Sequence, residues 1–394
     1  MKLGALISTA TLVALAIFAC VPPPSPPGPP PPTGAPAPPP PGSTRAFLGC
    51  QPQSIDASNF VARKVSLLPA GFVPQATGSQ YQTPVCAVGV NIPANISADL
   101  TNAFSLAHPH FRDQLCGLTC IFINQTPCKN PRHCTVDDVT DNSWGYREQQ
   151  QSQSPNGGRY IATSAALWER GHPDALSVYE GKVLGRLTQL PTGSAPSHGP
   201  AMPNNKPEVT VLAALAHELG HVRWYDANVP VPGGPYDFGR TLPCSNGAFR
   251  FFDGSWQYTS TSFLEIPNRW RNFGERVDPT VIANGQLNHR NAPQLRPIYD
   301  AIDRHDVRAL GPLNAALHQN NQPWASFFGM VTPDEDFVET YRLWVLKEAG
   351  LQSFPVTIPH GNGNNPASGN IIADLLAGNK MELGRKIDCV AAIP

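Results

Sequence analysis

The chain has 394 residues, with 28 basic against 29 acidic side chains and a formal net charge of −1. This near neutrality excludes the electrostatic footprint of a nucleic-acid-binding protein or of a protein drawn to an anionic membrane surface. The length suits two average domains or one enzyme domain with insertions, so a large core is easily buried. Any partner must therefore be recognised through a specific site.

The first twenty residues have the pattern of an export signal. Lys2 gives a positive start, and residues 3–18 form an apolar run that is too short for a comfortable membrane span. The end of this segment also resembles a bacterial lipoprotein signal, in which Cys20 is lipidated, although Phe18 is bulkier than that pattern usually allows. We expect a secreted or cell-envelope protein, periplasmic or on the outer surface, that contacts a membrane only through a lipid anchor at Cys20.

Residues 21–44 are mostly proline with Gly, Ala and Ser, which favours an extended, disordered spacer. The alternative is a ligand tract for a proline-reading module. Residues 45–394 are expected to form one folded domain, with a loop-rich insertion at about 228–325. We expect the insertion to be anchored by Trp256, Trp270 and Trp324.

Eight of the nine cysteines follow Cys20, and an even number suits four disulfides in an oxidising compartment. They are Cys50, Cys86, Cys116, Cys120, Cys128, Cys134, Cys244 and Cys389. The alternative for the closely spaced group from Cys116 to Cys134, with His133 beside the last, is a structural zinc site. Their spacing matches no common zinc knuckle, and an exported chain favours disulfides.

Five segments carry clear secondary-structure signals, taken in chain order. Apolar residues at helical spacing predict a helix over 95–108, and a short apolar run predicts a strand over 118–124. Residues 159–168 are typical of a strand entering a turn or helix. The clearest helix is 207–226, which starts with proline and is apolar nearly all round, as a buried helix should be. A second helix is predicted over 332–348, with Thr332 at its cap.

The predicted helix 207–226 carries His217 and His221, which are four residues apart. This spacing places both imidazoles on one helix face with their Cβ atoms about 5–6 Å apart, so both can reach one ion. Glu218 can face the same ion without binding it and accept a proton from a water molecule. The alternative is a helix with two hydrogen-bonded core histidines, but burying His, Glu and His together is costly unless they serve a function.

The string His217-Glu218-Leu219-Gly220-His221 resembles the zincin metallopeptidases. Trp224 and Ala227 stand where the metzincin branch needs a glycine and a third ligand, which excludes that branch. The segment 328–339 resembles the Glu-x-Phe-x-Glu segment of gluzincins, and is most similar to the catalytic domain of anthrax lethal factor and its secreted relatives.

That resemblance implies that Glu335 is the third zinc ligand and that Glu339 steadies a ligand histidine. Thr332 to Glu335 also form a capping box, so acidic residues are favoured there for the helix alone. The other ligand candidates are Glu339 itself and, in the insertion, Asp253 or Glu265. Phe328 stands where lethal-factor relatives have a tyrosine that stabilises the oxyanion, so that donor must come from elsewhere, for example His360 or a tyrosine in the insertion, or the site is catalytically weak.

Together these features predict an α+β, disulfide-stapled, zincin-like fold with a mixed sheet and an active-site helix. The expected function is that of an exported, monomeric Zn²⁺ metallopeptidase, which hydrolyses peptide or protein substrates with a zinc-bound water that Glu218 activates. Tyr160 to Ala165 is the candidate edge strand for an extended substrate. Two alternatives stay open: a weakly active or non-catalytic binding module, which Phe328 favours and Glu218 disfavours, and a zinc hydrolase that acts on something other than peptides.

Overall fold

The structure is a computed structural model, and it describes parts of the chain that include both segments with the predicted metal ligands. The described residues are 55–70, 72, 76–77, 80–81, 85–130, 136–140, 142–147, 158–169, 206–228, 251, 256–257, 288–289, 321–326, 328–330, 333–358 and 367–393. The predicted export signal, Cys20, the proline-rich segment and most of the predicted insertion lie outside them. Among the described helices, none is long and apolar enough to cross a membrane.

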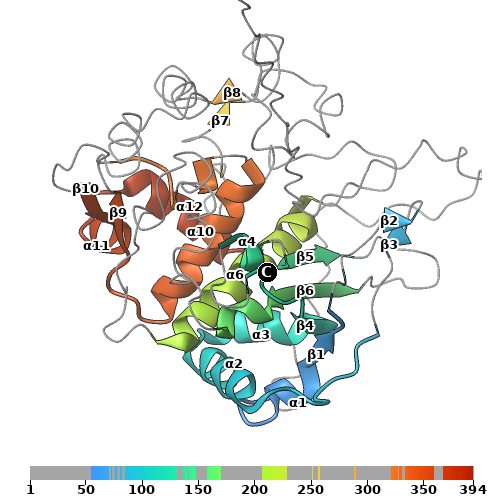
Figure 1. The fold of residues 1–394 in the computed structure, drawn as a ribbon. Helices are drawn as coiled ribbons and strands as arrows, with labels where there is room; N and C mark the ends of the chain where they lie inside the picture. The colour runs from blue at the N-terminus through green and yellow to red at the C-terminus, as the bar shows by residue number, and fades with distance from the viewer. Residues whose placement is uncertain are drawn as a thin grey trace, which may run out of the picture.

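The described chain combines helices with a small mixed sheet (Figure 1). The helices are α1 (Phe60–Lys64), α2 (Ala94–Leu106), α3 (Pro109–Gly117), α4 (Val136–Thr140), α6 (Pro207–Asn228), α10 (Pro333–Glu348), α11 (Ile371–Leu376) and α12 (Met381–Ala391), with 3-10 turns η1 (Ala165–Trp168) and η4 (Phe328–Met330). The strands are β1 (Val65–Leu68), β2 (Ala76–Thr77), β3 (Gln80–Tyr81), β4 (Cys120–Asn124), β5 (Trp144–Arg147), β6 (Arg159–Ser164), β7 (Trp256–Gln257), β8 (Asn288–His289), β9 (Pro355–Ile358) and β10 (Ala367–Asn370).

The main sheet has the strand order β1-β4-β6-β5. β1, β4 and β6 are parallel, and β5 runs antiparallel to β6, with Gly145 opposite Ile161. β6 therefore lies between two strands, and its backbone hydrogen-bonding groups face β4 on one side and β5 on the other. The prediction that Tyr160 to Ala165 forms a substrate-binding edge strand is wrong, because β5 occupies that edge.

The sheet buries side chains on both faces, as a largely parallel sheet usually does. On β4, Ile121 and Ile123 belong to the large core that includes the helices, whereas Cys120 and Phe122 belong to a smaller apolar cluster. This alternation follows from the two-residue period of a strand. β4 is buried along its whole length, which explains its continuous apolar sequence.

Cys86 and Cys120 form a disulfide, with Cα atoms 6.0 Å apart, that ties the segment before α2 to the start of β4. Cys116, Cys128 and Cys389 are also disulfide-bonded. The expectation of disulfides is met for these five residues, and the alternative of a structural zinc site in this group is wrong. A sulfur atom in a disulfide cannot serve as a thiolate ligand. Cys50, Cys134 and Cys244 lie outside the described residues.

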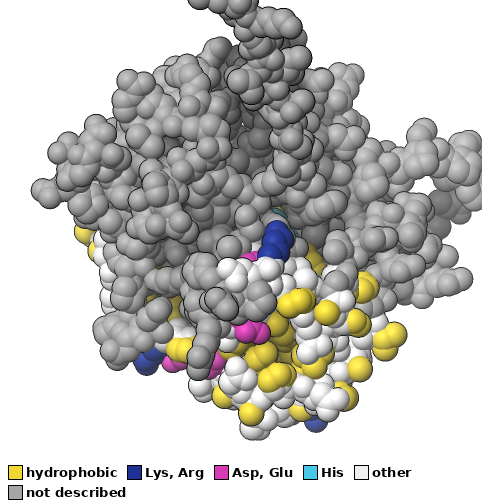
Figure 2. All heavy atoms as spheres, viewed as in Figure 1, with side chains coloured by type: hydrophobic (Ala, Val, Ile, Leu, Met, Phe, Trp, Pro, Cys, Tyr) yellow, Lys and Arg dark blue, Asp and Glu magenta, His cyan; other side chains and the backbone are white. Residues whose placement is uncertain are grey.

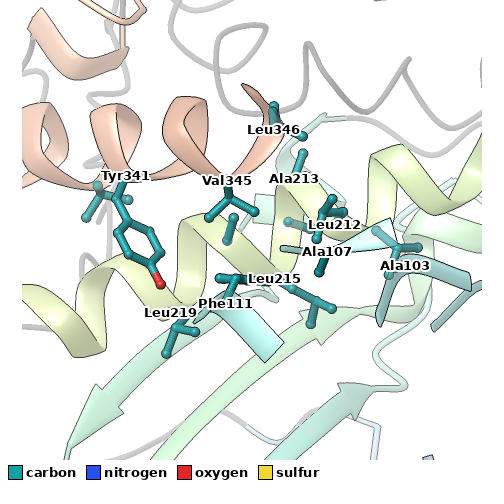
Figure 3. Packing of buried hydrophobic residues seen from close by; sticks show 14 of the residues in the cluster. Ala103, Ala107, Phe111, Leu212, Ala213, Leu215, Leu219, Tyr341, Val345 and Leu346 are labelled. Carbon is teal, nitrogen blue, oxygen red and sulfur yellow. The ribbon is translucent and has the colours of Figure 1, made fainter. Parts of the chain in front are cut away.

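Helix α6 lies between the sheet and α10 (Figure 1), and contacts α10, α2, β5 and β6. It is apolar nearly all round because each of its faces is covered by another element. Figure 3 shows side chains of α10 packed over those of α6: Tyr341, Val345 and Leu346 above Leu212, Ala213, Leu215 and Leu219. At the closest approach, a Cβ built on Gly220 would lie 3.2 Å from the Cα of Val338, so a small residue is needed there.

The first turn of α10 is tied to α12 by a buried ion pair. The Nζ of Lys386 donates to Asp336 Oδ1 at 2.6 Å, to Asp336 Oδ2, and to the carbonyl of Pro323 at 3.1 Å. The same ammonium lies 4.8 Å from the ring centroid of Phe251 and 5.2 Å from that of Trp324. Lys386 and Asp336 are both fully buried, and the positive charge of the lysine neutralises the negative charge of the aspartate in the core.

The predicted elements are present with small shifts in their ends. Residues 159–168 form β6 followed by η1, residues 207–228 form α6, and residues 333–348 form α10. The predicted helix 95–108 corresponds to α2, which ends at Leu106 and is followed by a separate helix, α3, that starts with proline. The predicted strand 118–124 is shorter, since β4 starts at Cys120.

Two features of the insertion are described. Trp324 is fully buried, as expected for an anchor, and Trp256 lies in β7, which pairs with β8. Trp270 lies outside the described residues.

On the face drawn in Figure 2, the described surface over α1 and α2 mixes apolar and uncharged polar side chains with scattered charges.

We expect Lys386→Met to lower the free energy of unfolding by about 3–5 kcal/mol, because it leaves the Asp336 carboxylate buried without its counterion. The matched control is Arg385→Met on the same helix. Arg385 Nη1 lies 3.0 Å from Glu382 Oε1, but its side chain is 55% exposed. Removing that exposed pair should change stability by about 1 kcal/mol or less. Chemical denaturation of both variants measures the difference, and equal effects would contradict this account of the buried pair.

Candidate metal centre

One turn of α6 carries the two histidines and the glutamate singled out in the sequence. His217 and Glu218 are each 2% exposed and His221 is 8% exposed. The histidine ring centroids lie 5.0 Å apart, as expected for residues i and i+4 on one helix face. The predicted helix therefore places both imidazoles at one point in the interior.

Glu335 reaches the same point from the first turn of α10. Glu335 Oε2 lies 3.8 Å from Nε2 of His217, and Glu335 Oε1 lies 3.8 Å from Nε2 of His221. One ligand atom from each of these three residues lies within 4.8 Å of the others. Ligands about 2.0–2.2 Å from a tetrahedral ion lie roughly 3.3–3.6 Å from one another, so a small contraction would bring this set to bonding distance.

Glu339 lies one helical turn after Glu335 and contacts the other ring nitrogen of His217. The distance from Nδ1 of His217 to Oε1 of Glu339 is 2.7 Å, and Arg342 Nη2 donates to Oε2 of the same carboxylate. A ligand histidine usually donates its second ring N–H to such a carboxylate, which fixes the tautomer. The arrangement thus leaves Nε2 of His217 facing Glu335.

The electrostatics of the site suit a cation. Burial, together with the neighbouring His217, holds the pKa of His221 well below its usual value, so its imidazole is neutral and has a lone pair available. Burial alone would raise the pKa of Glu339, but Arg342 and the hydrogen bond from His217 hold it below the ordinary value. With His217 also in its neutral form, the two imidazoles and the carboxylate of Glu335 make a donor set that divalent transition metals bind in proteins.

Strand β5 passes directly against the turn of α6 that carries the candidate ligands. A Cβ built on Gly145 would lie 2.1 Å from the carbonyl oxygen of Glu218 and 3.4 Å from Cβ of His221. No side chain fits at this position, so the glycine allows the sheet edge to approach the turn that carries Glu218.

Phe328 lies beside the candidate ligands, with its ring centroid 5.7 Å from that of His217. Its neighbour Gly329 donates its backbone N–H to Ser326 Oγ at 3.0 Å, and Ser326 in turn hydrogen-bonds Glu339. The apolar ring of Phe328 therefore lies beside the candidate ligands, at the position where the resemblance to lethal factor implies a tyrosine.

The structure brings together His217, His221 and Glu335 as a possible set of three ligands. Glu339 is not one of the three, because it contacts Nδ1 of His217, the ring nitrogen that faces away from Glu335. Asp253, Glu265 and His360 lie outside the described residues, as does the capping residue Thr332.

Sequence reasoning missed three further contributors: Arg342, Ser326 and Gly145. The glycine in Trp-Gly-Tyr was a weak signal, since an isolated glycine in a strand often marks a close backbone approach.

If the site holds a metal ion, adding Zn²⁺ should raise the melting temperature of the metal-free protein. Binding to the folded state alone stabilises it by about 2.7 kcal/mol at a free ion concentration one hundred times the Kd. Glu335→Gln should lose most of this stabilisation. Glu348→Gln is the control, because Glu348 lies on the same helix and pairs with Lys347 at the partly exposed end of α10. Thermal unfolding with and without a chelator is the measurement, and an equal zinc response in both variants would exclude Glu335 as a ligand.

We expect Gly145→Ala to lower the free energy of unfolding by about 1–3 kcal/mol, because the new methyl group must displace β5 from α6. Gly384→Ala is the matched control. A Cβ at Gly384 would meet only Leu375 Cδ1, at 3.7 Å, and alanine is the better residue inside helix α12. Denaturant unfolding should show opposite signs for the two variants, and a neutral Gly145→Ala would contradict the close approach.

The histidine pair, the glutamate on α10 and the glycine on β5 define the geometry from which a function has to be inferred. Comparisons of the chain with family models, with curated proteins and with solved structures found no match.

Proposed function

We propose that the protein is an exported zinc-dependent metallopeptidase with a zincin-like fold. The observation that carries the proposal is the convergence of His217, His221 and Glu335, with Glu218 on the same helical turn. Zinc suits two imidazoles and one carboxylate, and a set of three protein ligands is typical of catalytic rather than structural zinc sites. The sequence resemblance to gluzincins supports the same assignment.

In this proposal, bound zinc supplies a Lewis acid that makes water more acidic and polarises the carbonyl group of the substrate. Glu218 acts as the general base: it accepts a proton from water and passes it to the leaving amine. Its burial, 2% exposed, keeps bulk water from competing for that proton. Glu339 orients His217 through the 2.7 Å hydrogen bond.

The sheet supports peptides as the substrate class of this proposal. β5 is the edge strand of the described sheet, and Gly145 brings it against the turn that carries Glu218. An edge strand offers backbone N–H and C=O groups to an extended chain, which is how many proteins bind peptides. We therefore infer that an extended peptide pairs with β5, rather than with β6, on its way to the site.

A second candidate is a non-catalytic module that binds peptides and keeps the metal site. Phe328 favours it, because its ring lies beside His217 and has no hydroxyl group to stabilise an oxyanion. Glu218 favours the enzyme, because a purely structural metal site has no need of a buried carboxylate next to its ligands.

The two candidates are separated by comparing wild type with Glu218→Gln in a casein digestion assay, with the zinc content of both proteins measured. For the peptidase, we expect the variant to retain zinc and to lose on the order of 10²–10⁴-fold in rate, because only the general base is removed. The chelated wild type should be inactive and should regain activity when zinc is restored.

Wild-type protein that binds zinc at one ion per chain and cleaves neither casein nor a mixed peptide library would favour the binding module. Activity that persists in Glu218→Gln would rule out the role proposed for this glutamate. A wild-type protein that binds no zinc would remove the basis of both candidates.

A further inference from the structure

We propose that Arg342 is a positioning residue for the metal centre. Through Glu339, it holds His217 in the tautomer with hydrogen on Nδ1, so that Nε2 is presented to the ion. This inference rests on the proposed zinc site, and the arginine acts on that site through the carboxylate of Glu339.

The first step is the geometry of the chain of contacts. Arg342 Nη2 donates to Oε2 of Glu339, and Oε1 of the same carboxylate lies 2.7 Å from Nδ1 of His217. Arg342 is 2% exposed and Glu339 is 1% exposed. The guanidinium also lies 5.8 Å from the ring centroid of Phe354, which precedes β9. The arginine is therefore held in one place by both its carboxylate and its aromatic neighbour.

The second step is the direction of the hydrogen bonds. An arginine has donors and no acceptor, so Oε2 of Glu339 must accept. The carboxylate then faces His217 with an acceptor oxygen, and Nδ1 must be the donor. In the neutral form that binds a metal, the imidazole of His217 has its one N–H on Nδ1, which leaves the lone pair on Nε2, the atom that lies 3.8 Å from Oε2 of Glu335.

The third step is what would happen without the arginine. The Glu339 side chain would keep its bond to His217 but lose the donor that fixes the orientation of its carboxyl group. A carboxylate that can rotate accepts less firmly from Nδ1, so the imidazole is no longer held in the one tautomer that presents Nε2 to the ion. Such outer contacts typically account for 10–100-fold in metal affinity.

The competing explanation is purely structural. Arg342 and Glu339 are three residues apart on α10, and ion pairs at this spacing stabilise helices whatever lies beyond them. On that explanation, replacing Arg342 would lower stability but leave zinc affinity and the histidine tautomer unchanged. The two explanations therefore differ in quantities that can be measured on folded protein.

The experiment measures Zn²⁺ affinity by competition with a chelator, together with the tautomer of His217 in the metal-free protein by ¹⁵N NMR of the imidazole. For Arg342→Met, we expect zinc binding weakened by about 10–100-fold and a mixture of tautomers, against one tautomer protonated on Nδ1 in wild type. Arg342→Lys keeps the charge but loses the planar fork, and should bind zinc about tenfold more weakly. It serves as the test if Arg342→Met does not fold.

Arg223→Met is the matched control. Arg223 is equally buried, at 2% exposed, and lies on α6 two residues after His221. Its Nη1 lies 3.5 Å from Asp226, a carboxylate that also pairs with Arg159. This variant should lose stability yet bind zinc as wild type does.

Three outcomes would overturn the inference, and they differ in what else they affect. If the folded Arg342 variants bind zinc as tightly as wild type and show the same His217 tautomer, this inference is overturned but the proposed zinc site is not. An equal loss of affinity in Arg223→Met would also overturn it, because the effect would then be a general consequence of lost stability. A wild-type protein without zinc affinity would overturn both this inference and the proposed function.

Discussion

The close packing of α6 on α10 is the contact on which the candidate site depends. Gly220 lies between the two histidines of α6, and its missing side chain leaves room for Val338 of α10. At this distance, one turn of α10 presents Glu335 and Glu339 to the same imidazole from two sides, since His217 faces one carboxylate with Nε2 and the other with Nδ1. A larger residue at Gly220 would press against Val338, and α10 would have to shift to make room for it.

The interior near this contact holds two buried ion pairs that both involve α10. Lys386 of α12 pairs with Asp336 of α10, and Arg342 pairs with Glu339 further along α10. Buried ion pairs rarely stabilise a protein more than apolar residues of similar volume would. Both pairs involve the first turns of α10, so they help to hold in position the helix end that carries Glu335.

The parts of the site that the sequence predicts are those set by local spacing. His217 and His221 converge because a helix repeats every 3.6 residues, and α10 begins at the expected proline. Other features depend on contacts between distant segments. The sequence does not predict the strand order, because β5 has four residues and no alternating pattern, and it therefore wrongly indicates β6 as the edge strand. The pairing of Cys86 with Cys120 was open for the same reason, since spacing does not determine disulfide connectivity.

Strand β5 connects the architecture of the sheet with the proposed choice of substrate. A metal centre with three protein ligands could serve many hydrolytic reactions, so the ligands do not distinguish a peptide from a smaller substrate. The neighbouring strand does favour one class. Because Gly145 lets the backbone of β5 approach the carbonyl of Glu218, an extended chain that hydrogen-bonds to the outer edge of β5 would run beside the turn that carries the proposed general base. A compact substrate would gain nothing from this edge, whereas a polypeptide would gain a hydrogen bond at alternate residues.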